Sequence, residues 1–245
     1  MFNRIALACT AALVFAVPVA SFATTLGSNL IVNGNAEADV GSSDGSEIGP
    51  VTGFTRTGQF TVVKYGAGGG FPQATDPGPT DRGNNFFAGG PSAGQSTGSQ
   101  VIQVGDASAA IDSGTVGYDL SAWLGGYATQ DDNAVLTLAF LDTDSAQLGT
   151  ASLGPVTEPE RGGNTGLLFR DLMGLVPVGT RSIDVTLTLT REEGSYDDGY
   201  ADNLSLVLRG GSPSAVPEPD NLALMFAGMG ALALALRRRP ARSRG

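Results

Sequence analysis

The chain has 245 residues, of which 24 are acidic, 14 are basic and none is histidine. Without histidine it can build neither a Ser-His-Asp nor a Cys-His catalytic set, nor a metal site that needs imidazole. The net charge of −10 disfavours nucleic acid as a partner, because a phosphate backbone would be repelled. The 36 glycines suit a β protein with many tight turns.

The N-terminus has the pattern of a secretory signal peptide, residues 1–23. Arg4 supplies a positive charge, residues 5–17 form an apolar run, and small residues at the −3 and −1 positions predict cleavage by signal peptidase after Ala23. The alternative, a retained transmembrane helix, needs about 20 apolar residues, more than this run contains. Cys9 is the sole cysteine and lies inside the signal, so the mature chain is expected to lack any thiol.

Residues 24–211 are expected to form the exported domain. Between residues 24 and 216 the chain carries 22 acidic and 8 basic residues, a net charge of −14. We interpret most of this charge as favouring solubility through self-repulsion, and a few carboxylates as calcium ligands. The acidic stretches 131–132 and 192–198 lack EF-hand spacing and predict solvated turns.

Short strand-like segments dominate this domain. Residues 183–189 and 204–208 alternate apolar and polar side chains, and residues 135–141 are nearly continuously apolar. The glycine- and proline-rich stretch 66–85 predicts a long surface loop that decorates the fold. Because turn residues separate the segments, the pattern predicts an all-β, antiparallel jelly-roll β-sandwich. Further strands are expected at residues 30–32, 60–65, 99–104, 117–123 and 167–170.

The C-terminal stretch 212–245 has three parts in a fixed order. A linker with a Pro-Glu-Pro motif (212–220) precedes an apolar segment (221–236) and a basic tail (237–245). As a helix the apolar run covers about 22 Å, and snorkelling arginines and bilayer thinning can make up part of a ~30 Å hydrocarbon core. We therefore predict a short transmembrane helix whose basic end stays cytoplasmic. The motif is Val216, Pro217, Glu218 and Pro219, and the basic stop-transfer cluster is Arg237, Arg238 and Arg239.

This order of motif, apolar span and basic end resembles the PEP-CTERM sorting signal of Gram-negative bacteria. The resemblance implies export across the inner membrane, anchoring by the C-terminal helix, and cleavage near the Pro-Glu-Pro motif by an exosortase. The product would then reach the cell surface or the extracellular matrix. Asp220 departs from the pattern, because a small residue is more usual after the motif. The signal is an address and does not specify what the domain does.

Two segments at opposite ends of the domain form a second pattern. Residues 29–37 read Asn-Leu-Ile-Val-Asn-Gly-Asn-Ala-Glu, and residues 198–206 contain Asp-Asn-Leu-Ser-Leu; between them, residues 119–126 read Asp-Leu-Ser-Ala-Trp-Leu-Gly-Gly. Together they resemble jelly-roll domains of the galactose-binding-like type, a fold that carbohydrate-binding modules use widely. The resemblance implies that Glu37 and Asp202 meet beside one structural calcium that joins the first strand to the last. The alternative is that Glu37 caps a turn and Asp202 bonds the backbone at a strand start.

Sugar binding needs an aromatic surface together with planar polar groups. The loop residues Tyr127, Asp132, Arg161 and Tyr196 are the candidate ligand contacts. Trp123 is the only tryptophan, and its place in a strand favours the core.

These features favour a non-enzymatic, surface-sorted protein that binds carbohydrate or forms part of an exopolysaccharide or biofilm matrix. No catalytic residue is assigned. The expected partners are signal peptidase, exosortase, the inner membrane in transit and a glycan. The alternative is a small extracellular glycoside hydrolase or lyase, because some pair among 22 acids could supply the two carboxylates such chemistry needs.

Overall fold

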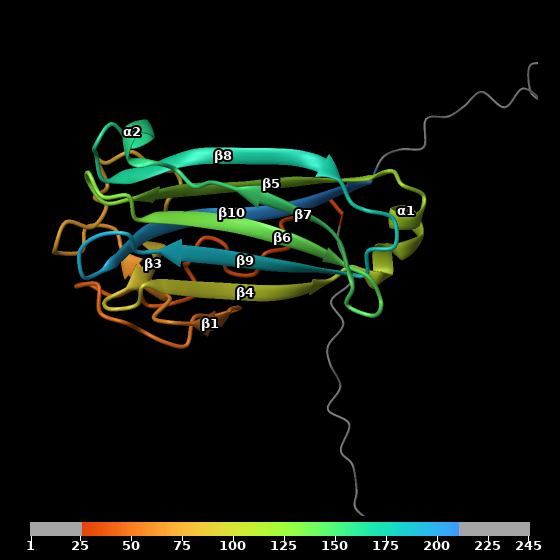
Figure 1. Cartoon of the computed structure of the whole chain (residues 1–245), viewed down its shortest axis with the longest axis horizontal. Coiled ribbons are helices and arrows are strands. Elements are labelled where there is room, and N and C mark those ends of the chain that lie inside the picture. The colour runs from red at the N-terminus through yellow and green to blue at the C-terminus, as the bar shows by residue number, and fades with distance from the viewer. Residues whose placement is uncertain (1–25, 211–245) are drawn as a thin grey trace, which may run out of the picture.

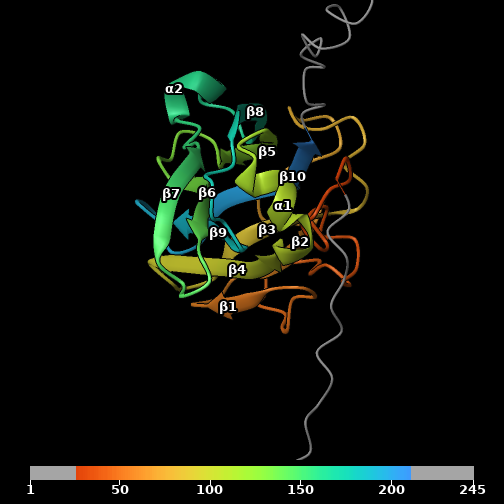
Figure 2. The same ribbon diagram turned by 90° about the vertical axis from the view of Figure 1, so that its right-hand side faces the viewer.

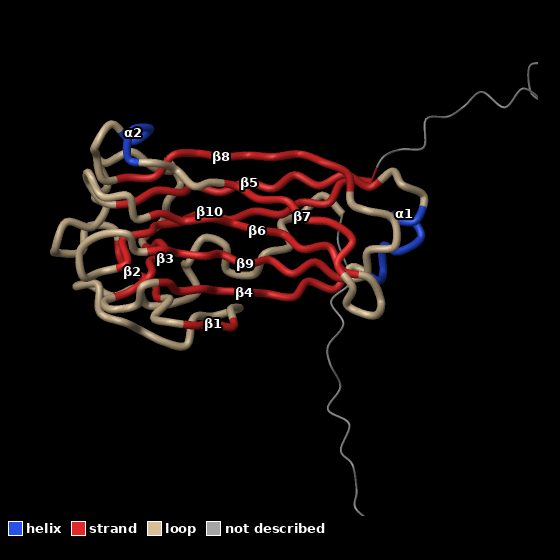
Figure 3. The backbone as a smooth tube through the Cα atoms, in the orientation of Figure 1, coloured by secondary structure: helices blue, strands red, loops and turns tan. Residues whose placement is uncertain are grey.

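The computed structural model describes residues 26–210, which form a sandwich of two five-stranded antiparallel sheets (Figures 1 and 3). The predicted all-β sandwich is thereby confirmed. The predicted signal peptide, sorting motif and C-terminal helix lie outside the described residues. No helix within residues 26–210 is long and apolar enough to cross a membrane.

The two sheets pack face to face, as the end-on view of Figure 2 shows. Sheet one has the order β1 (Thr55–Thr57), β4 (Gln95–Gln103), β9 (Ser182–Thr190), β6 (Asn133–Leu141) and β7 (Gln147–Leu153). Sheet two has the order β2 (Thr61–Lys64), β3 (Asn85–Gly90), β10 (Asp197–Gly210), β5 (Val116–Gly126) and β8 (Gly166–Leu175). The helical elements are a 3-10 turn (Gly105–Ala107), α1 (Ser108–Asp112) and α2 (Glu158–Arg161).

Alternation along the strands places the core between the sheets. In β9 the apolar side chains of Val185, Leu187 and Leu189 are fully buried, while the intervening residues are half-buried. The same period of two operates in β5, where Leu120 and Leu124 face inward. Each sheet thus has an inner face that forms the core and an outer face that points away from it.

The N-terminal segment runs beside β10. The amide of Leu30 donates to Leu206 O (2.8 Å) and the amide of Leu204 donates to Gly34 O (2.8 Å). Residues 30–32, predicted as a strand, form no regular strand; Asn29 makes an isolated bridge to Val207 instead. Because Gly27 also bonds Leu208 (2.8 Å), the described chain begins and ends at the same end of the sandwich.

The predicted surface loop covers part of the outer face of sheet two. Phe71 packs against Phe86 and Tyr200, with ring centroids 6.3 and 6.1 Å apart. Farther along the loop, the guanidinium of Arg82 lies 5.0 Å from the ring centroid of Tyr65. These contacts build a second apolar cluster outside the main core. The loop was predicted to be decoration, and it is instead a packed layer.

The sandwich has two unlike ends (Figure 1). We call the end that carries α1 together with Leu26 and Gly210 the exit end. We call the opposite end the acidic end, because its loops 127–132, 154–165 and 191–196 hold six carboxylates. These are Asp131, Asp132, Glu158, Glu160, Glu192 and Glu193.

Candidate functional site

A cleft opens on the part of sheet two that the loop leaves uncovered. It has a volume of about 470 Å³ and lies over β5, β8 and β10, with the N-terminal segment along one side. Its position follows from strand alternation. Because Leu120, Ala122 and Leu124 of β5 point into the core, Ser121 and Trp123 must point outward. The cleft therefore occupies the solvent face of a sheet whose other face is fixed by core packing.

Two aromatic rings form the apolar surface of the cleft. Trp123 of β5 and Phe169 of β8 are register partners, with ring centroids 5.7 Å apart at an interplanar angle of 59°. Phe169 is 48% exposed, and Trp123 is half-buried. The sequence favoured the core for Trp123, but the structure places it on the outer face of the sheet. A pair of partly exposed rings on a rigid sheet offers a ready surface for the apolar face of a ligand.

Polar groups surround these rings. Asn203 lies in the bulge of β10 between Asp202 and Ser205, with φ at 49°, and its side-chain amide donates to Asp81 Oδ1 (2.9 Å). Ser205 and Ser121 are cross-strand partners, so their hydroxyls share one face. The bulge thus points the Asn203 amide into the cleft beside two hydroxyls, and the loop before β3 adds the Asp81 carboxylate.

Two further asparagines that line the cleft use their side chains in hydrogen bonds within the protein. Asn29 donates to Leu204 O (3.0 Å) and accepts from the amide of Leu206 (3.0 Å). Asn33 donates to Asp39 Oδ2 (2.8 Å) and accepts from the amide of Ala38 (2.9 Å). They therefore hold the cleft wall, and Asp81, Asn203, Ser121 and Ser205 are better placed to meet a ligand.

Asp202 sits directly beneath this bulge. It is fully buried; its Oδ2 accepts from the Tyr65 hydroxyl (2.8 Å) and its Oδ1 from the amide of Asn203 (2.7 Å). Burial raises the pKa of Asp202 to about 8, with the negative charges of Glu37 and Asp81 adding to the rise. The three carboxyl groups thus interact electrostatically, and the fold brings Glu37 toward Asp202.

Glu37 itself holds a turn. Its Oε1 accepts from the amides of Asn84 (2.7 Å) and Asn85 (2.8 Å). The side-chain oxygen of Asn85 is buried without a hydrogen-bond partner. These bonds match the alternative in which Glu37 caps a turn and Asp202 bonds the backbone. The calcium between Glu37 and Asp202 stays a prediction.

The donor set at this position suits a hard cation. All the candidate ligands are oxygen atoms, and a buried carboxyl group beside two other acids would be relieved by a positive charge. Within residues 26–210, no three Asp, Glu, His or Cys side chains cluster as a metal site. A calcium held by Glu37 and Asp202 would therefore need further oxygen ligands from the backbone or from water.

Asp132 and Arg161, both predicted ligand contacts, are structural groups at the acidic end. Asp132 is 0% exposed and accepts from the amides of Glu192 (2.7 Å), Glu193 (2.8 Å) and Asp198 (2.8 Å). Because both side chains are buried and bonded to the backbone, we do not place either residue in the cleft.

The bonds of Arg161 show its role most clearly. The side chain is 6% exposed, and its guanidinium donates to the carbonyls of Ala128 (2.8 Å), Asn164 (2.9 Å) and Gln130 (2.6 Å). Burial lowers the pKa of Arg161, although the neighbouring acids oppose this shift. Arg161 therefore ties α2 and its loop to the loop that follows β5.

Tyr127 and Tyr196 belong to the second apolar cluster. The ring of Tyr196 meets that of Phe71 edge-on, at 5.1 Å and 76°, and its hydroxyl is buried without a partner. Burial raises the pKa of this hydroxyl. A side-chain carbon added at Gly70 would come within 2.6 Å of the Tyr127 ring, so that ring lies against the loop. These two rings anchor the loop, and neither lines the cleft.

The residues that sequence reasoning missed are Trp123, Phe169, Asp81 and Asn203. One signal was available: within residues 117–123, the tryptophan shares its strand face with Asp119 and Ser121, which are polar. Strict alternation would have predicted that the tryptophan side chain points outward. No comparable signal existed for Asp81, because a loop brings it to the sheet.

The fold and the cleft define an antiparallel jelly-roll β-sandwich with an aromatic cleft on the outer face of one sheet. Residues 215–239 match the PEP-CTERM protein-sorting motif, as predicted. No curated protein matches the chain.

Among solved structures, a Family 16 Carbohydrate Binding Module is similar, at 21% identity and a TM-score of 0.44, over 73% of this chain and 99% of that one. A xylan-binding CBM22-1 domain from Paenibacillus barcinonensis is similar at 13% identity and a TM-score of 0.38, over 68% of this chain and 92% of that one. The enzymatically active domain of tailspike protein 4 from bacteriophage CBA120 is similar at 17% identity and a TM-score of 0.44, over 74% of this chain. This chain spans only 21% of that tailspike chain. These similarities are too low to carry a function over to this protein.

Proposed function

We propose that this is a non-enzymatic protein that binds glycan in the cleft on sheet two. The observation that supports this most directly is the Trp123–Phe169 pair with polar groups at its rim. Sugars present apolar faces of C–H groups and edges of hydroxyls, so an aromatic ring flanked by amide, hydroxyl and carboxylate groups matches both. The rings and Ser121 stand on regular strands, which would keep the cleft preformed.

The sorting motif indicates an exported protein that is anchored in a membrane and then processed at the surface. We propose that signal peptidase removes residues 1–23 and that an exosortase acts near Pro217–Pro219. The membrane would be the inner membrane of a Gram-negative bacterium. Exopolysaccharide or another matrix glycan is the natural partner in that location. The protein would then be a glycan-binding component of the cell surface or of the extracellular matrix.

A hydrolase or lyase is the second candidate, and the cleft gives it little support. Hydrolysis by paired carboxylates needs two acids about 5–9.5 Å apart on either side of the scissile bond. Asp81 is the one carboxylate among the described residues that line the cleft. Asp171 lies across from Ser121 on β8 and could serve only if a sugar extended over that strand.

Incubating the exported domain with an array of bacterial exopolysaccharides and plant polysaccharides would separate these functions. We expect retention on at least one glycan with no release of reducing ends or unsaturated products. Product formation that disappears in Asp81→Asn or Asp171→Asn would establish the enzyme instead. Absence of retention on every glycan would count against the binding proposal.

We also propose one structural calcium, held by Glu37 and Asp202. Its bound charge would offset the repulsion among Glu37, Asp81 and Asp202 and would join the N-terminal segment to β10. Because Asp202 lies directly under Asn203, the ion would also stiffen one wall of the cleft. In this role calcium supplies stability and takes no part in chemistry.

A further inference from the structure

Exposed apolar side chains gather at the exit end of the sandwich. Of the ten large hydrophobic residues that are exposed among residues 26–210, five lie there, and none lies in the three loops of the acidic end. Met173 (70% exposed), Leu175 (68%) and Val178 (59%) lead the group. Monomeric proteins rarely leave such a group uncovered without a binding purpose. The other two are Leu26 and Leu148.

These residues are neighbours across several elements. Leu175 is the register partner of Gly117, which in turn pairs with Arg209 at the end of β10. A side-chain carbon at Gly179 would lie 3.5 Å from Leu148, and one at Gly210 would lie 3.1 Å from Leu26. The apolar group therefore surrounds the point at which the described chain ends.

The length of chain after Gly210 limits how far the exit end can lie from an embedded sorting segment. Eleven residues separate Gly210 from the apolar run that begins at Leu222. Fully extended, they reach about 36–40 Å, comparable with the ~40 Å diameter of a domain of this size. While the sorting segment is uncut and embedded, the tether leaves the domain from the exit end, and it is short enough to keep that end within about 40 Å of the lipid.

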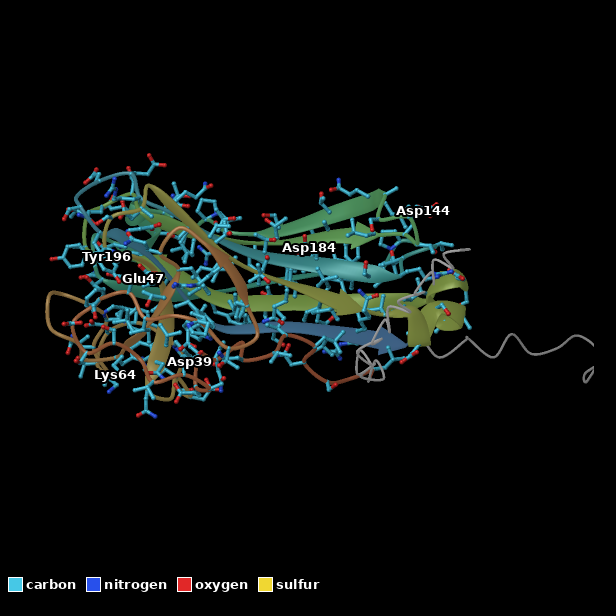
Figure 4. All side chains as sticks on the ribbon, turned by 90° about the horizontal axis from the view of Figure 1, so that it is seen from below. Asp39, Glu47, Lys64, Asp144, Asp184 and Tyr196 are labelled. Carbon is cyan, nitrogen blue, oxygen red and sulfur yellow. The ribbon has the colours of Figure 1, made fainter. Side chains whose placement is uncertain are left out.

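Ion pairs neutralise two of the carboxylates near the apolar group. Arg209 pairs with Asp119, and Arg181 pairs with Asp112 at 2.7 Å. Asp144 is also at the exit end, as are Asp106 and Asp142, whereas Glu47 and Tyr196 lie toward the other end (Figure 4). The six carboxylates of the acidic end lie at the end opposite the anchor. Tethering would also let a weak lipid contact persist, because the local concentration is high.

We propose that the exit end is a membrane-contacting surface, in which Met173, Leu175 and Val178 enter the interfacial layer of the bilayer before the sorting segment is cleaved. Apolar side chains at the headgroup boundary gain free energy by burial, and no spanning element is required for this contact. The contact would hold the motif at a fixed height and orientation beside a membrane-embedded protease. It depends on the sorting segment and is independent of glycan binding.

The test uses the chain with its sorting segment intact, reconstituted in phosphatidylcholine vesicles. Since the only cysteine is in the signal, Val178→Cys in the signal-free chain gives a single labelling site for an environment-sensitive fluorophore. Val40→Cys is the matched control, since Val40 is 82% exposed and lies beside Lys64, away from the exit end. We expect lipids with a nitroxide near the headgroup to quench the Val178 label roughly twofold more than the Val40 label.

A second variant checks that the apolar group causes this difference. Adding Met173→Ser and Leu175→Ser to the Val178→Cys chain should remove the additional quenching without changing the fold, because both side chains are exposed. Equal quenching of the two labels would overturn the proposal. A blue shift at residue 178 without nitroxide quenching would also overturn it, and would show that protein, from a second copy or the chain's own tail, covers this surface.

Discussion

At the scale of single residues, Asp202 is a carboxyl group that the fold buries completely. Its pKa of about 8 in the folded chain compares with 3.8 in an unperturbed chain, so the native state binds its proton more tightly than the unfolded state does. The stability that this proton contributes is complete below pH 3.8 and is lost as the pH rises through about 8. Above that pH the native state must hold a buried negative charge beside Glu37.

Because deprotonation of Asp202 destabilises the native state, both pH and calcium should change the melting temperature. In EDTA, the melting temperature of the exported domain should fall between pH 5 and pH 9, and Asp202→Asn should reduce that fall by at least about 3 °C, roughly 1 kcal/mol. Calcium at pH 8 should raise the melting temperature of the native sequence and leave that of Asp202→Asn unchanged. Scanning calorimetry across pH, with and without calcium, measures both effects.

Two outcomes of that scan would contradict the account. If EDTA and calcium give the same melting curve, no calcium bridges Glu37 and Asp202. If Asp202→Asn has the same pH profile as the native sequence, Asp202 is not the group whose protonation stabilises the fold. Asp197 remains in both proteins and, because burial raises its pKa to about 8 as well, part of the pH dependence should survive the substitution.

Residue roles were the least predictable part of the sequence. The resemblance to galactose-binding-like domains implied that Glu37 and Asp202 meet beside a calcium, and that site stays a prediction. Asp132 and Arg161, predicted as ligand contacts, are buried in the structure, because loop position in the sequence does not reveal burial. Backbone amides of residues 192, 193 and 198, at least sixty positions away, converge on Asp132, and no local pattern encodes that.

At the scale of elements, alternation predicted the strands that have one face in the core. The segments 117–123, 135–141, 183–189 and 204–208 all fall within observed strands. β3 escaped prediction because all six of its residues are buried. Phe87 faces the core and Phe86 faces the loop cluster, so apolar and polar residues do not alternate along this strand.

Other elements were missed for different reasons. β1 and β7 are edge strands with mostly exposed residues, and a strand without a buried face has little apolar pattern. α2 has four residues, and its signal is the capping box of Thr157 and Glu160 rather than any apolar period. The loop after β2 acquired its structural role from tertiary contacts, such as those of Phe71, Asp81 and Arg82.

The pairing of β5 with β8 gives an element-scale prediction, because these two strands carry the aromatic pair. A methyl group at Gly125 would overlap the backbone carbonyl of Gly166 in β8, whereas one at Gly117 would meet only Gly174 O at 3.4 Å. We expect Gly125→Ala to lower the free energy of unfolding by about 2 kcal/mol and Gly117→Ala to change it far less. Urea midpoints measure the difference. Equal midpoints for the two variants would show that the close approach of β5 and β8 is not required.

At the scale of the whole molecule, the fold separates three surfaces. The cleft occupies the outer face of sheet two, the carboxylate-rich loops occupy one end, and the chain leaves the domain from the other end. A domain with 22 acids between residues 24 and 216 repels copies of itself, which favours solubility. An embedded tail would hold the acidic end outward and leave the cleft on the side, open to a polysaccharide chain.

The central claim is that glycan occupies the cleft beside Trp123. The fluorescence of this tryptophan can report that binding directly. Since Trp123 is the only tryptophan, tryptophan fluorescence excited at a wavelength that tyrosine does not absorb comes from the cleft alone. Titrating the exported domain with oligosaccharides of the glycan retained on the array should give a saturable change in tryptophan emission. Trp123→Ala should weaken binding measured by calorimetry at least about tenfold, or ~1.4 kcal/mol, while Tyr127→Ala should leave it unchanged. Binding that is detected by calorimetry without any change in emission, and that survives Trp123→Ala, would contradict the account.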